Sequence, residues 1–120
     1  MVSEARYVLV VEDDADLRET LQEVLEYAGF ENVCVEDGAQ GLRTVAERGA
    51  PRLIFLDLVM PVMDGWTFLS ALRADARYAA VPVIVTTSAP SRAPRGVLVL
   101  QKPVKPETIE QEARRYMGGD

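Results

Sequence analysis

The sequence predicts an α/β protein built on a doubly wound five-stranded parallel sheet. Short apolar segments rich in β-branched residues alternate along the chain with segments whose apolar residues recur at helical spacing. One of the apolar segments, residues 52–58, is apolar on both faces, as a central strand of a parallel sheet is. Strands and helices that alternate in this way form right-handed crossovers, which place successive strands parallel to one another.

The first half of the chain predicts two strands and two helices. Residues 7–11 (YVLVV) and 32–36 (NVCVE) are the strands, because β-branched valines dominate both. Apolar residues at helical spacing predict a helix over residues 17–28 and a shorter one over residues 39–46. Capping residues flank both helices: Asp13 or Asp14 and Gly29 for the first, Asp37 and Gly49 for the second.

The second half predicts three strands and two helices. The strands are the apolar runs at residues 52–58, 81–87 and 96–101. A loop over residues 60–66 (MPVMDGW) leads into a third helix, which Trp66, Leu69 and Leu72 line on one side. Residues 105–117 (KPETIEQEARRYM) form the closing helix.

The stretch between the fourth and fifth strands is too short for a helix. From Ser88 to Gln101 there are 14 residues, whereas an average helix, a strand and two loops need roughly 24. Pro90, Pro94 and Gly96 also break helices. We therefore expect a loop over residues 88–96 with at most one irregular turn.

The composition is that of an ordinary globular protein. The 120 residues fit a single domain over residues 1–120, with 48% hydrophobic and 27% charged residues. The formal net charge of −6 argues against nucleic acid or an anionic membrane surface as the main partner. No apolar run is long enough to span a membrane, and no signal peptide opens the chain, so we expect no membrane association.

The cysteine and histidine content limits the kinds of catalytic and metal site that the chain can form. The single Cys34 lies between two valines, which predicts a reduced, half-buried strand residue and a cytoplasmic protein. The absence of histidine excludes catalytic triads based on His, zinc sites that use His and imidazole general bases. The chain also cannot carry a phosphohistidine itself.

Acidic residues end two of the predicted strands. Glu12 and Asp13 follow the first strand, and Asp57 ends the third, inside the otherwise apolar stretch LIFLDLVMP. An isolated buried carboxylate is costly, so Asp57 needs a partner. In an open sheet of order 2-1-3-4-5 the first and third strands flank the switch point at which ligands bind, and the three acids would converge there. Because like charges repel and the set offers only oxygen ligands, it predicts a Mg²⁺ site.

Two more polar residues end the remaining strands. Thr87 ends the fourth strand and Lys102 follows the fifth. A carboxylate with Mg²⁺, a hydroxyl and an ammonium group around it suits an acyl phosphate, formed when Asp57 attacks a phosphoryl group in line while Lys102 offsets the charge. Each residue alone has an ordinary explanation: Asp13 as a helix cap, Thr87 as a strand residue, Lys102 as a solvated surface charge. Their joint placement at strand ends favours the phosphate site.

The chain resembles the receiver domain of two-component response regulators over nearly its full length. VLVVEDD resembles the acidic opening of that family, LIFLDLVMPVMDGW resembles its phosphoacceptor strand and following loop, and PVIVTT and QKP resemble its later strands. The resemblance implies a flavodoxin-like fold with strand order 2-1-3-4-5, similar to a chemotaxis receiver but with a shortened segment between strands four and five.

The resemblance also implies a role for each acid. Asp57 would be the phosphoacceptor and a Mg²⁺ ligand. Asp13 would bind Mg²⁺ directly, and Glu12 would contribute through water. The backbone carbonyl of Val59, two residues after the acceptor, would be a further protein ligand of the metal.

Further implied roles come with departures from the family pattern. Thr87 would be the switch hydroxyl that moves onto the phosphate, and Lys102, joined to Pro103 by a cis peptide, would pair with the phosphate. Ser88 is an alternative switch hydroxyl, because TTSA also aligns one residue later, although an ungapped alignment favours Thr87.

Two further departures from the family pattern concern strand five and the segment before it. Val99 stands where the family usually has an aromatic residue, so the conformational change of an aromatic side chain that follows the switch hydroxyl cannot operate there. The missing helix removes part of the surface that the family uses for output or dimerisation.

The function we expect is that of a phosphoacceptor. The domain would take a phosphoryl group from a sensor histidine kinase or a histidine phosphotransfer protein onto Asp57 and then change its affinity for a downstream protein target. It would not be an enzyme beyond catalysing its own phosphorylation and dephosphorylation.

The alternative function is that of a protein-binding module that acts without phosphorylation, which Val99 and the shortened segment favour. A phosphatase is disfavoured, because Val59 stands where such enzymes have a second aspartate. The sequence leaves open the cognate kinase, the target, the oligomeric state and whether the chain is part of a larger protein.

Overall fold

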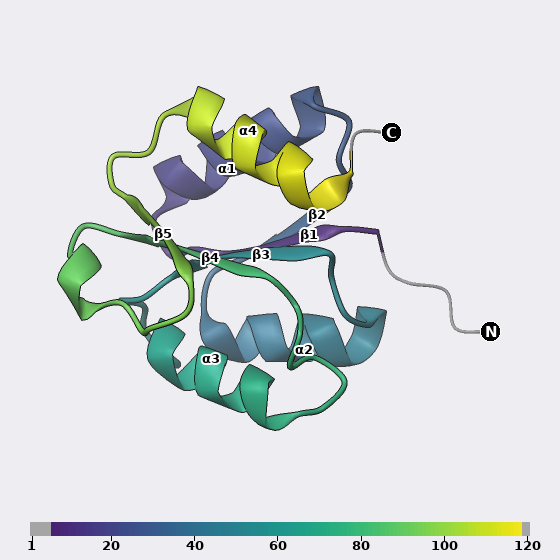
Figure 1. The fold of residues 1–120 in the computed structure, drawn as a ribbon, viewed down its shortest axis with the longest axis vertical. Helices are drawn as coiled ribbons and strands as arrows, with labels where there is room; N and C mark the ends of the chain where they lie inside the picture. The colour runs from purple at the N-terminus through teal and green to yellow at the C-terminus, as the bar shows by residue number, and fades with distance from the viewer. Residues whose placement is uncertain (1–5, 119–120) are drawn as a thin grey trace.

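A parallel β-sheet forms the centre of the structure (Figure 1). The computed structural model describes residues 6–118. Its strands are β1 (Val8–Val11), β2 (Asn32–Val35), β3 (Leu53–Asp57), β4 (Val83–Thr87) and β5 (Leu98–Gln101). They are ordered β2-β1-β3-β4-β5 and all neighbours are parallel. The doubly wound α/β fold and the predicted order 2-1-3-4-5 are confirmed.

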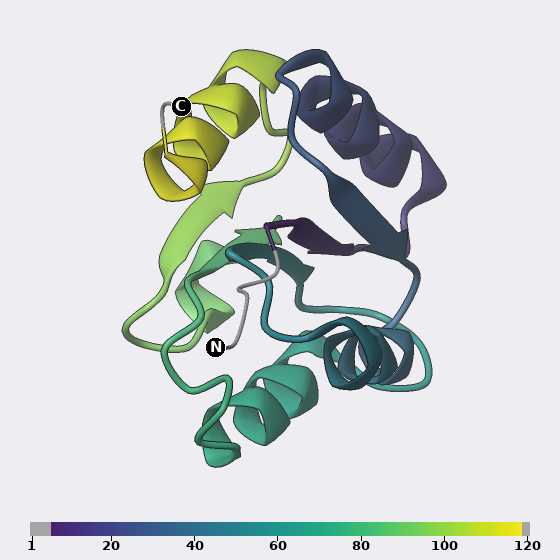
Figure 2. The ribbon, with the colours of Figure 1, turned by 90° about the vertical axis from the view of Figure 1, so that its right-hand side faces the viewer.

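Helices cover both faces of this sheet. One face carries α2 (Gly38–Arg48) and α3 (Gly65–Ala74), and the other carries α1 (Ala15–Tyr27) and α4 (Pro106–Met117), as Figures 1 and 2 show. The C-terminal helix is α4, since no α-helix lies between β4 and β5. Within residues 6–118 no helix has the length and apolar character that a membrane crossing requires.

Aspartate side chains begin three of the helices. Asp14, Asp37 and Asp64 each accept hydrogen bonds from first-turn N–H groups of α1, α2 and α3. Of the two candidates for the cap of α1, Asp14 takes the role, because its Oδ1 accepts from the N–H groups of Asp16 and Leu17. Asp13 is therefore not engaged as a helix cap.

The predicted elements all form, with ends that differ by one or two residues. Two strands begin later than expected: β4 at Val83 instead of residue 81, and β5 at Leu98 instead of residue 96. Pro82 has no N–H to donate to the sheet, although its carbonyl accepts from Ile54 N at 3.0 Å. Gly96 has a φ of 83°, which turns the chain just before β5.

A single 3₁₀ turn, η1 (Pro90–Arg92), stands between β4 and β5. This confirms the expectation of a loop with one irregular turn. Trp66 of α3 holds the turn in two ways. Its indole N–H donates to the carbonyl of Arg92 at 3.0 Å, and the Arg92 guanidinium lies over the indole ring, 5.1 Å from its centroid. The segment that replaces a helix is thus tied to α3.

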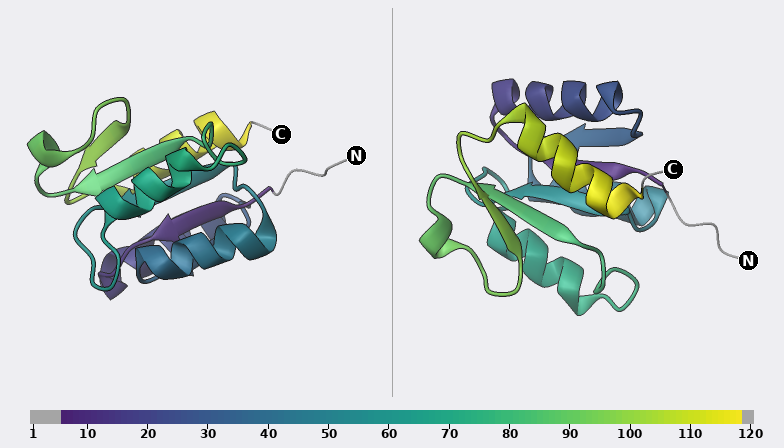
Figure 3. Two further views of the ribbon diagram at one scale, coloured as in Figure 1. Left: turned by 90° about the horizontal axis from the view of Figure 1, so that it is seen from below. Right: turned by 45° about the horizontal axis from the view of Figure 1, so that its top comes forward.

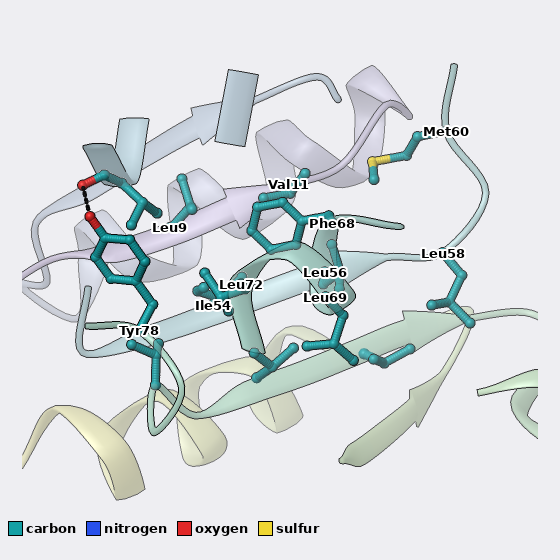
Figure 4. Close-up of a cluster of buried hydrophobic side chains, with 14 of the residues drawn as sticks. Leu9, Val11, Ile54, Leu56, Leu58, Met60, Phe68, Leu69, Leu72 and Tyr78 are labelled. Carbon is teal, nitrogen blue, oxygen red and sulfur yellow. Dashed lines mark hydrogen bonds between the residues drawn. The ribbon is translucent and has the colours of Figure 1, made fainter. Parts of the chain in front are cut away.

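The sheet separates two hydrophobic clusters. The cluster beneath α2 and α3 contains Leu9, Phe68 and Leu72 and is drawn in Figure 4. The cluster beneath α1 and α4 contains Val10 and Ile109. Leu9 and Val10 are consecutive residues of β1 and both are fully buried, because side chains alternate between the two faces of a strand.

Cys34 lies half-buried in β2 with a free thiol, as the valines beside it predicted. Its Sγ donates to Asn32 Oδ1 at 3.4 Å. Burial raises the pKa of the thiol to about 11, so the thiol stays protonated at neutral pH.

Val62, in the loop after β3, has a strained backbone. Its φ is 67°, in the left-handed region that β-branched residues rarely adopt, and its side chain is 84% exposed, so no burial offsets the strain. We expect Val62→Gly to raise the free energy of unfolding by about 1 kcal/mol, which is the relieved strain less the entropy that glycine adds to the unfolded chain. Urea denaturation measures the change.

The control for this prediction is Val59→Gly. Val59 is also exposed, at 64%, but its φ is not positive. Glycine there gains flexibility without relieving strain and should lower stability. Equal effects of the two substitutions would contradict the explanation.

Candidate functional site

The carboxyl ends of the strands form one edge of the sheet, the side toward which the strands point and at which η1 lies in both views of Figure 3. β1 and β3 are adjacent at the centre of this edge, and the chain connections from them leave toward opposite faces of the sheet. This is the switch point at which open α/β sheets bind ligands. Glu12 directly follows β1, and Asp57 is the last residue of β3.

Three carboxylates converge at this switch point. One oxygen each of Glu12, Asp13 and Asp57 lie within 4.8 Å of one another. Glu12 is 1% exposed and Asp57 is 5% exposed, whereas Asp13 is exposed. The structure therefore brings together the three acids that the sequence proposed as metal ligands. Because Asp13 is exposed, the cluster is accessible from solvent on the side of this residue.

Lys102 is the cation that pairs with the buried acids. Its Nζ lies 3.2 Å from Asp57 Oδ1 and 3.3 Å from the carboxylate of Glu12. Its side chain is 22% exposed, so part of its charge is screened by water. This ion pair explains how Asp57 is tolerated at the end of an apolar strand: the carboxylate lies at the mouth of the sheet and has a cationic partner.

The close charges shift the pKa values of the site. Burial, and then the charge of Asp57, raise the pKa of Glu12 from 4.5 to about 7. Partial desolvation, a hydrogen bond with Asp57 and the charge of Asp57 also raise the pKa of Asp13. Burial lowers the pKa of Lys102, but the charges of Glu12 and Asp57 outweigh burial and raise it overall. A single ammonium does not neutralise three carboxylates, and a divalent cation would remove the remaining repulsion.

Backbone contacts fix the positions of the acids. Arg18 of α1 donates to the carbonyls of Glu12 at 2.9 Å and Asp13 at 3.3 Å, which holds the loop between β1 and α1. Gly65 N at the start of α3 donates to Leu58 O at 2.8 Å, which holds the end of β3. The sequence analysis missed Arg18, because its role depends on the path of the loop and not on helical spacing.

Two neighbouring threonines of β4 end near the site, and the switch role of Thr87 stays a prediction. Thr87 is buried at the end of β4, but its Oγ1 accepts from Ala89 N at 3.0 Å. The hydroxyl of Thr86 donates to Glu12 Oε1 at 3.5 Å, and Thr86 is the residue paired with Asp57 in the sheet. Ser88, the alternative switch residue, is exposed. The sequence analysis missed Thr86, although the alternation of side chains along β4 could have placed it on the face of Asp57.

Three other predicted features concern the backbone and strand β5. The Lys102–Pro103 peptide is cis, as predicted. Val99 lies in β5 opposite Val85 and packs against the cluster beneath α2 and α3, so no aromatic ring occupies its place. The side chain of Val59 is exposed, and the metal-binding role of its carbonyl stays a prediction.

A doubly wound sheet with acids, a hydroxyl and a lysine at its switch point is the arrangement of a receiver domain. A family model described as "Response regulator receiver domain" matches residues 8–114. The chain belongs to this family, as its resemblance predicted.

Curated relatives and solved structures agree with this assignment. The DNA-binding response regulator MtrA of Mycobacterium tuberculosis is 42% identical over 81 residues, which cover 68% of this chain and 34% of MtrA. The transcriptional regulatory protein PrrA of the same organism is 46% identical over 67 residues, covering 56% of this chain and 28% of PrrA. The chain thus spans about a third of the length of these relatives.

The similar structures are themselves receivers. The receiver domain of the sensor histidine kinase PA1611 from Pseudomonas aeruginosa, described with a magnesium ion in its active-site cleft, matches with a TM-score of 0.83 and 28% identity, over 93% of this chain and 97% of that one. The chemotaxis response regulator CheY4 of Vibrio cholerae matches with a TM-score of 0.80 and 29% identity, over 95% of this chain and 99% of that one.

Proposed function

We propose that this receiver domain accepts a phosphoryl group on Asp57 and switches partner binding in a phosphorelay. The observation that supports this most directly is the cluster of Glu12, Asp13 and Asp57 with the ammonium of Lys102 3.2 Å from the acceptor carboxylate. The donor would be the phosphohistidine of a sensor histidine kinase or of a histidine phosphotransfer protein. The domain would act in the cytoplasm, and its downstream target would be a protein.

In the transfer, the unphosphorylated carboxylate of Asp57 would be the nucleophile. An oxygen of Asp57 attacks the phosphorus of the phosphohistidine in line; the new O–P bond forms as the N–P bond breaks and the imidazole leaves. The site would open as Lys102 exchanges part of its contact with Asp57 for the phosphoryl oxygens, where it offsets the developing charge. Water would then hydrolyse the aspartyl phosphate, which releases inorganic phosphate and returns Asp57 to its starting state.

The acidic cluster fits a hard cation. Its ligands are carboxylate oxygens from Glu12, Asp13 and Asp57, and Asp13 is exposed enough to leave room for water ligands, which Mg²⁺ retains. These residues would hold Mg²⁺, with the carbonyl of Val59 as a further candidate ligand. The bound ion supplies positive charge for the phosphoryl oxygens during transfer.

Mg²⁺ affinity should depend on pH through Glu12. Since the raised pKa of Glu12 is about 7, this carboxyl is mostly protonated below pH 7 and must lose its proton before Mg²⁺ can bind beside it. The raised pKa of Asp13 changes the Mg²⁺ affinity in the same direction. We expect affinity to rise with pH up to about 7, by at most roughly tenfold per pH unit for the Glu12 proton, and then to level off. Calorimetric titration with MgCl₂ measures this. Glu12→Gln should flatten the profile, and an unchanged profile in that variant would contradict the assignment.

Phosphorylation should move the segment over residues 88–92. The hydroxyl of Thr87 accepts from the N–H of Ala89, so a turn of this hydroxyl toward a phosphate on Asp57 would disturb the segment, which is tied to the sole tryptophan, Trp66, through Arg92. We expect beryllofluoride with Mg²⁺, a phosphoryl mimic, to shift the emission of Trp66 and to change hydrogen exchange in the segment. Thr87→Val should bind the mimic without the shift. A mimic that binds while both signals stay constant would rule out this switch and leave phosphorylation itself standing.

The direct test is the reaction with a small phosphodonor. Incubation with Mg²⁺ and acetyl phosphate should add the mass of one phosphoryl group to the intact protein. The other candidate function is a phosphorylation-independent protein-binding module, which Val99 and the missing helix favour. A protein that stays unmodified while its acidic cluster binds Mg²⁺ would support that alternative instead.

A further inference from the structure

Strand β5 forms an uncovered edge of the sheet. Within residues 6–118 it pairs with β4 alone, and Figure 2 shows it at the margin of the molecule. Leu98 is 39% exposed, Gln101 is exposed, and Val99 and Leu100 are only partly buried. One short turn, η1, stands between β4 and β5 and lies beside β5, and within residues 6–118 no second strand pairs with this edge.

The open edge carries free backbone groups. Lys102 N, at the end of β5, donates to Thr87 O of β4 at 2.8 Å. Alternate residues of a strand direct their N–H and C=O groups to opposite sides, so those of Val99 and Gln101 point away from β4. Natural edge strands are usually protected by a charge, a proline or a bulge, and the sequence LVLQ of β5 has no charge or proline. The edge is therefore chemically ready to pair with another strand.

A groove lies alongside this edge. It has a volume of about 340 Å³ and is lined by Val99 and Gln101 of β5, by Pro103 and Val104 after it, and by Thr108 of α4. Apolar side chains that alternate along an extended segment could enter such a groove while the backbone of the segment pairs with β5.

The chain segment that contains β5 is cationic. Residues 88–106 contain Arg92, Arg95, Lys102 and Lys105 and no acidic residue, although Glu107 follows and the whole chain has a net charge of −6. Lys102 is paired with Asp57 and Glu12, and the guanidinium of Arg92 lies over Trp66. Arg95 before β5 and Lys105 after it are both exposed, and they place a positive charge beyond each end of the strand.

We propose that the edge of β5 is a docking site for an extended protein segment with an alternating apolar centre and acidic flanks, which adds a strand to the sheet. The acidic flanks would face Arg95 and Lys105. A second copy of this chain fits less well, because two β5 edges would bring cationic surroundings together. The proposal does not depend on phosphorylation, since the edge is open in the unmodified protein.

The test uses synthetic peptides with the full chain. One peptide has alternating valines and threonines flanked by glutamates; the comparison peptide has the same centre flanked by lysines. Fluorescence anisotropy should show binding of the acidic peptide and at least tenfold weaker binding of the basic one, and added salt should reduce the difference. Amide hydrogen exchange should show new protection at Val99 and Gln101 when the acidic peptide binds. Equal binding of both peptides, or no new protection at these two amides, would overturn the proposal.

Variants separate the edge from its charges. Gln101→Pro removes an outward N–H and blocks pairing, whereas Gln101→Ala keeps the N–H; we expect roughly tenfold weaker binding for the first and near-unchanged binding for the second. The double change Arg95→Glu and Lys105→Glu should reverse the preference between the peptides.

Two outcomes would overturn this choice of occupant. If the free protein forms a dimer, and Gln101→Pro abolishes the dimer, the edge binds a second copy of this chain. Binding of single-stranded DNA in place of the peptides would assign the cations to nucleic acid. The peptide titrations use the unmodified protein without a phosphodonor, so a failure of the phosphoacceptor proposal is distinguishable from a failure of this one.

Discussion

Asp57→Asn will take up no phosphoryl group from acetyl phosphate, while the wild-type protein gains one. The variant keeps the size of the side chain but loses the anionic oxygen that attacks phosphorus. Because Asp57 is 5% exposed and ends a buried strand, no neighbouring carboxylate can take its place in the same geometry. Intact-mass spectrometry after incubation with Mg²⁺ and acetyl phosphate measures the result. Phosphorylation of the variant at the wild-type rate would show that the acceptor is another residue.

The fold should survive this substitution. Three carboxylates lie within 4.8 Å of one another beside one lysine, so removing one negative charge reduces repulsion. We expect the free energy of unfolding of Asp57→Asn to equal or exceed that of the wild type, by up to about 1–2 kcal/mol, in a buffer without Mg²⁺. Denaturation in urea checks this. Loss of phosphorylation in a fully folded variant then assigns the chemistry to Asp57 and not to the stability of the sheet.

Gly65→Ala should destabilise the protein by about 3 kcal/mol. Gly65 begins α3, directly against the end of β3, and a Cβ atom there would lie 2.8 Å from Leu58 Cα and closer still to the carbonyl oxygen of Asp57. Both are backbone atoms of a buried segment, so they cannot turn aside as a side chain can. The helix would have to move away from the strand that carries Asp57. Thermal or urea unfolding measures the loss, and phosphorylation of the folded fraction should also slow.

Gly41→Ala is the matched control. A Cβ at Gly41 of α2 would lie 2.9 Å from the ring of Phe68, which is nearly as close. The atom it meets belongs to a side chain that can shift, and alanine favours a helix over glycine, so the net cost should be smaller than at Gly65. A loss at Gly41 as large as that at Gly65 would contradict the distinction between backbone and side-chain contacts.

Much of the fold follows from patterns within the sequence. The apolar strands, the capping aspartates and the prolines between β4 and β5 act over a few residues, and each predicted the element that the structure contains. The ends of strands were harder to place, because they depend on backbone pairing. Pro82 belongs to an apolar run, yet it lies outside β4, since a residue without an N–H cannot complete the ladder.

The site was predictable as a set of residues but not as a set of contacts. Asp57 and Lys102 were singled out by their places at strand ends, and the structure brings them within 3.2 Å. The contact of Thr86 with Glu12 spans 74 positions along the chain and depends on the register between β3 and β4. The left-handed backbone of Val62 has no signal in the sequence, because a β-branched residue is among the least expected in that conformation.

The separation of the two hydrophobic clusters by the sheet has a thermodynamic consequence. Leu72 and Ile109 belong to different clusters on opposite faces, so truncating one leaves the packing partners of the other in place. The energetic penalties of such substitutions should be additive within about 0.5 kcal/mol, whereas pairs within one layer should show coupling. Substitutions in one cluster should therefore need no compensating substitutions in the other cluster. The residues at the strand ends, which form the functional site, lie in the sheet between the two clusters.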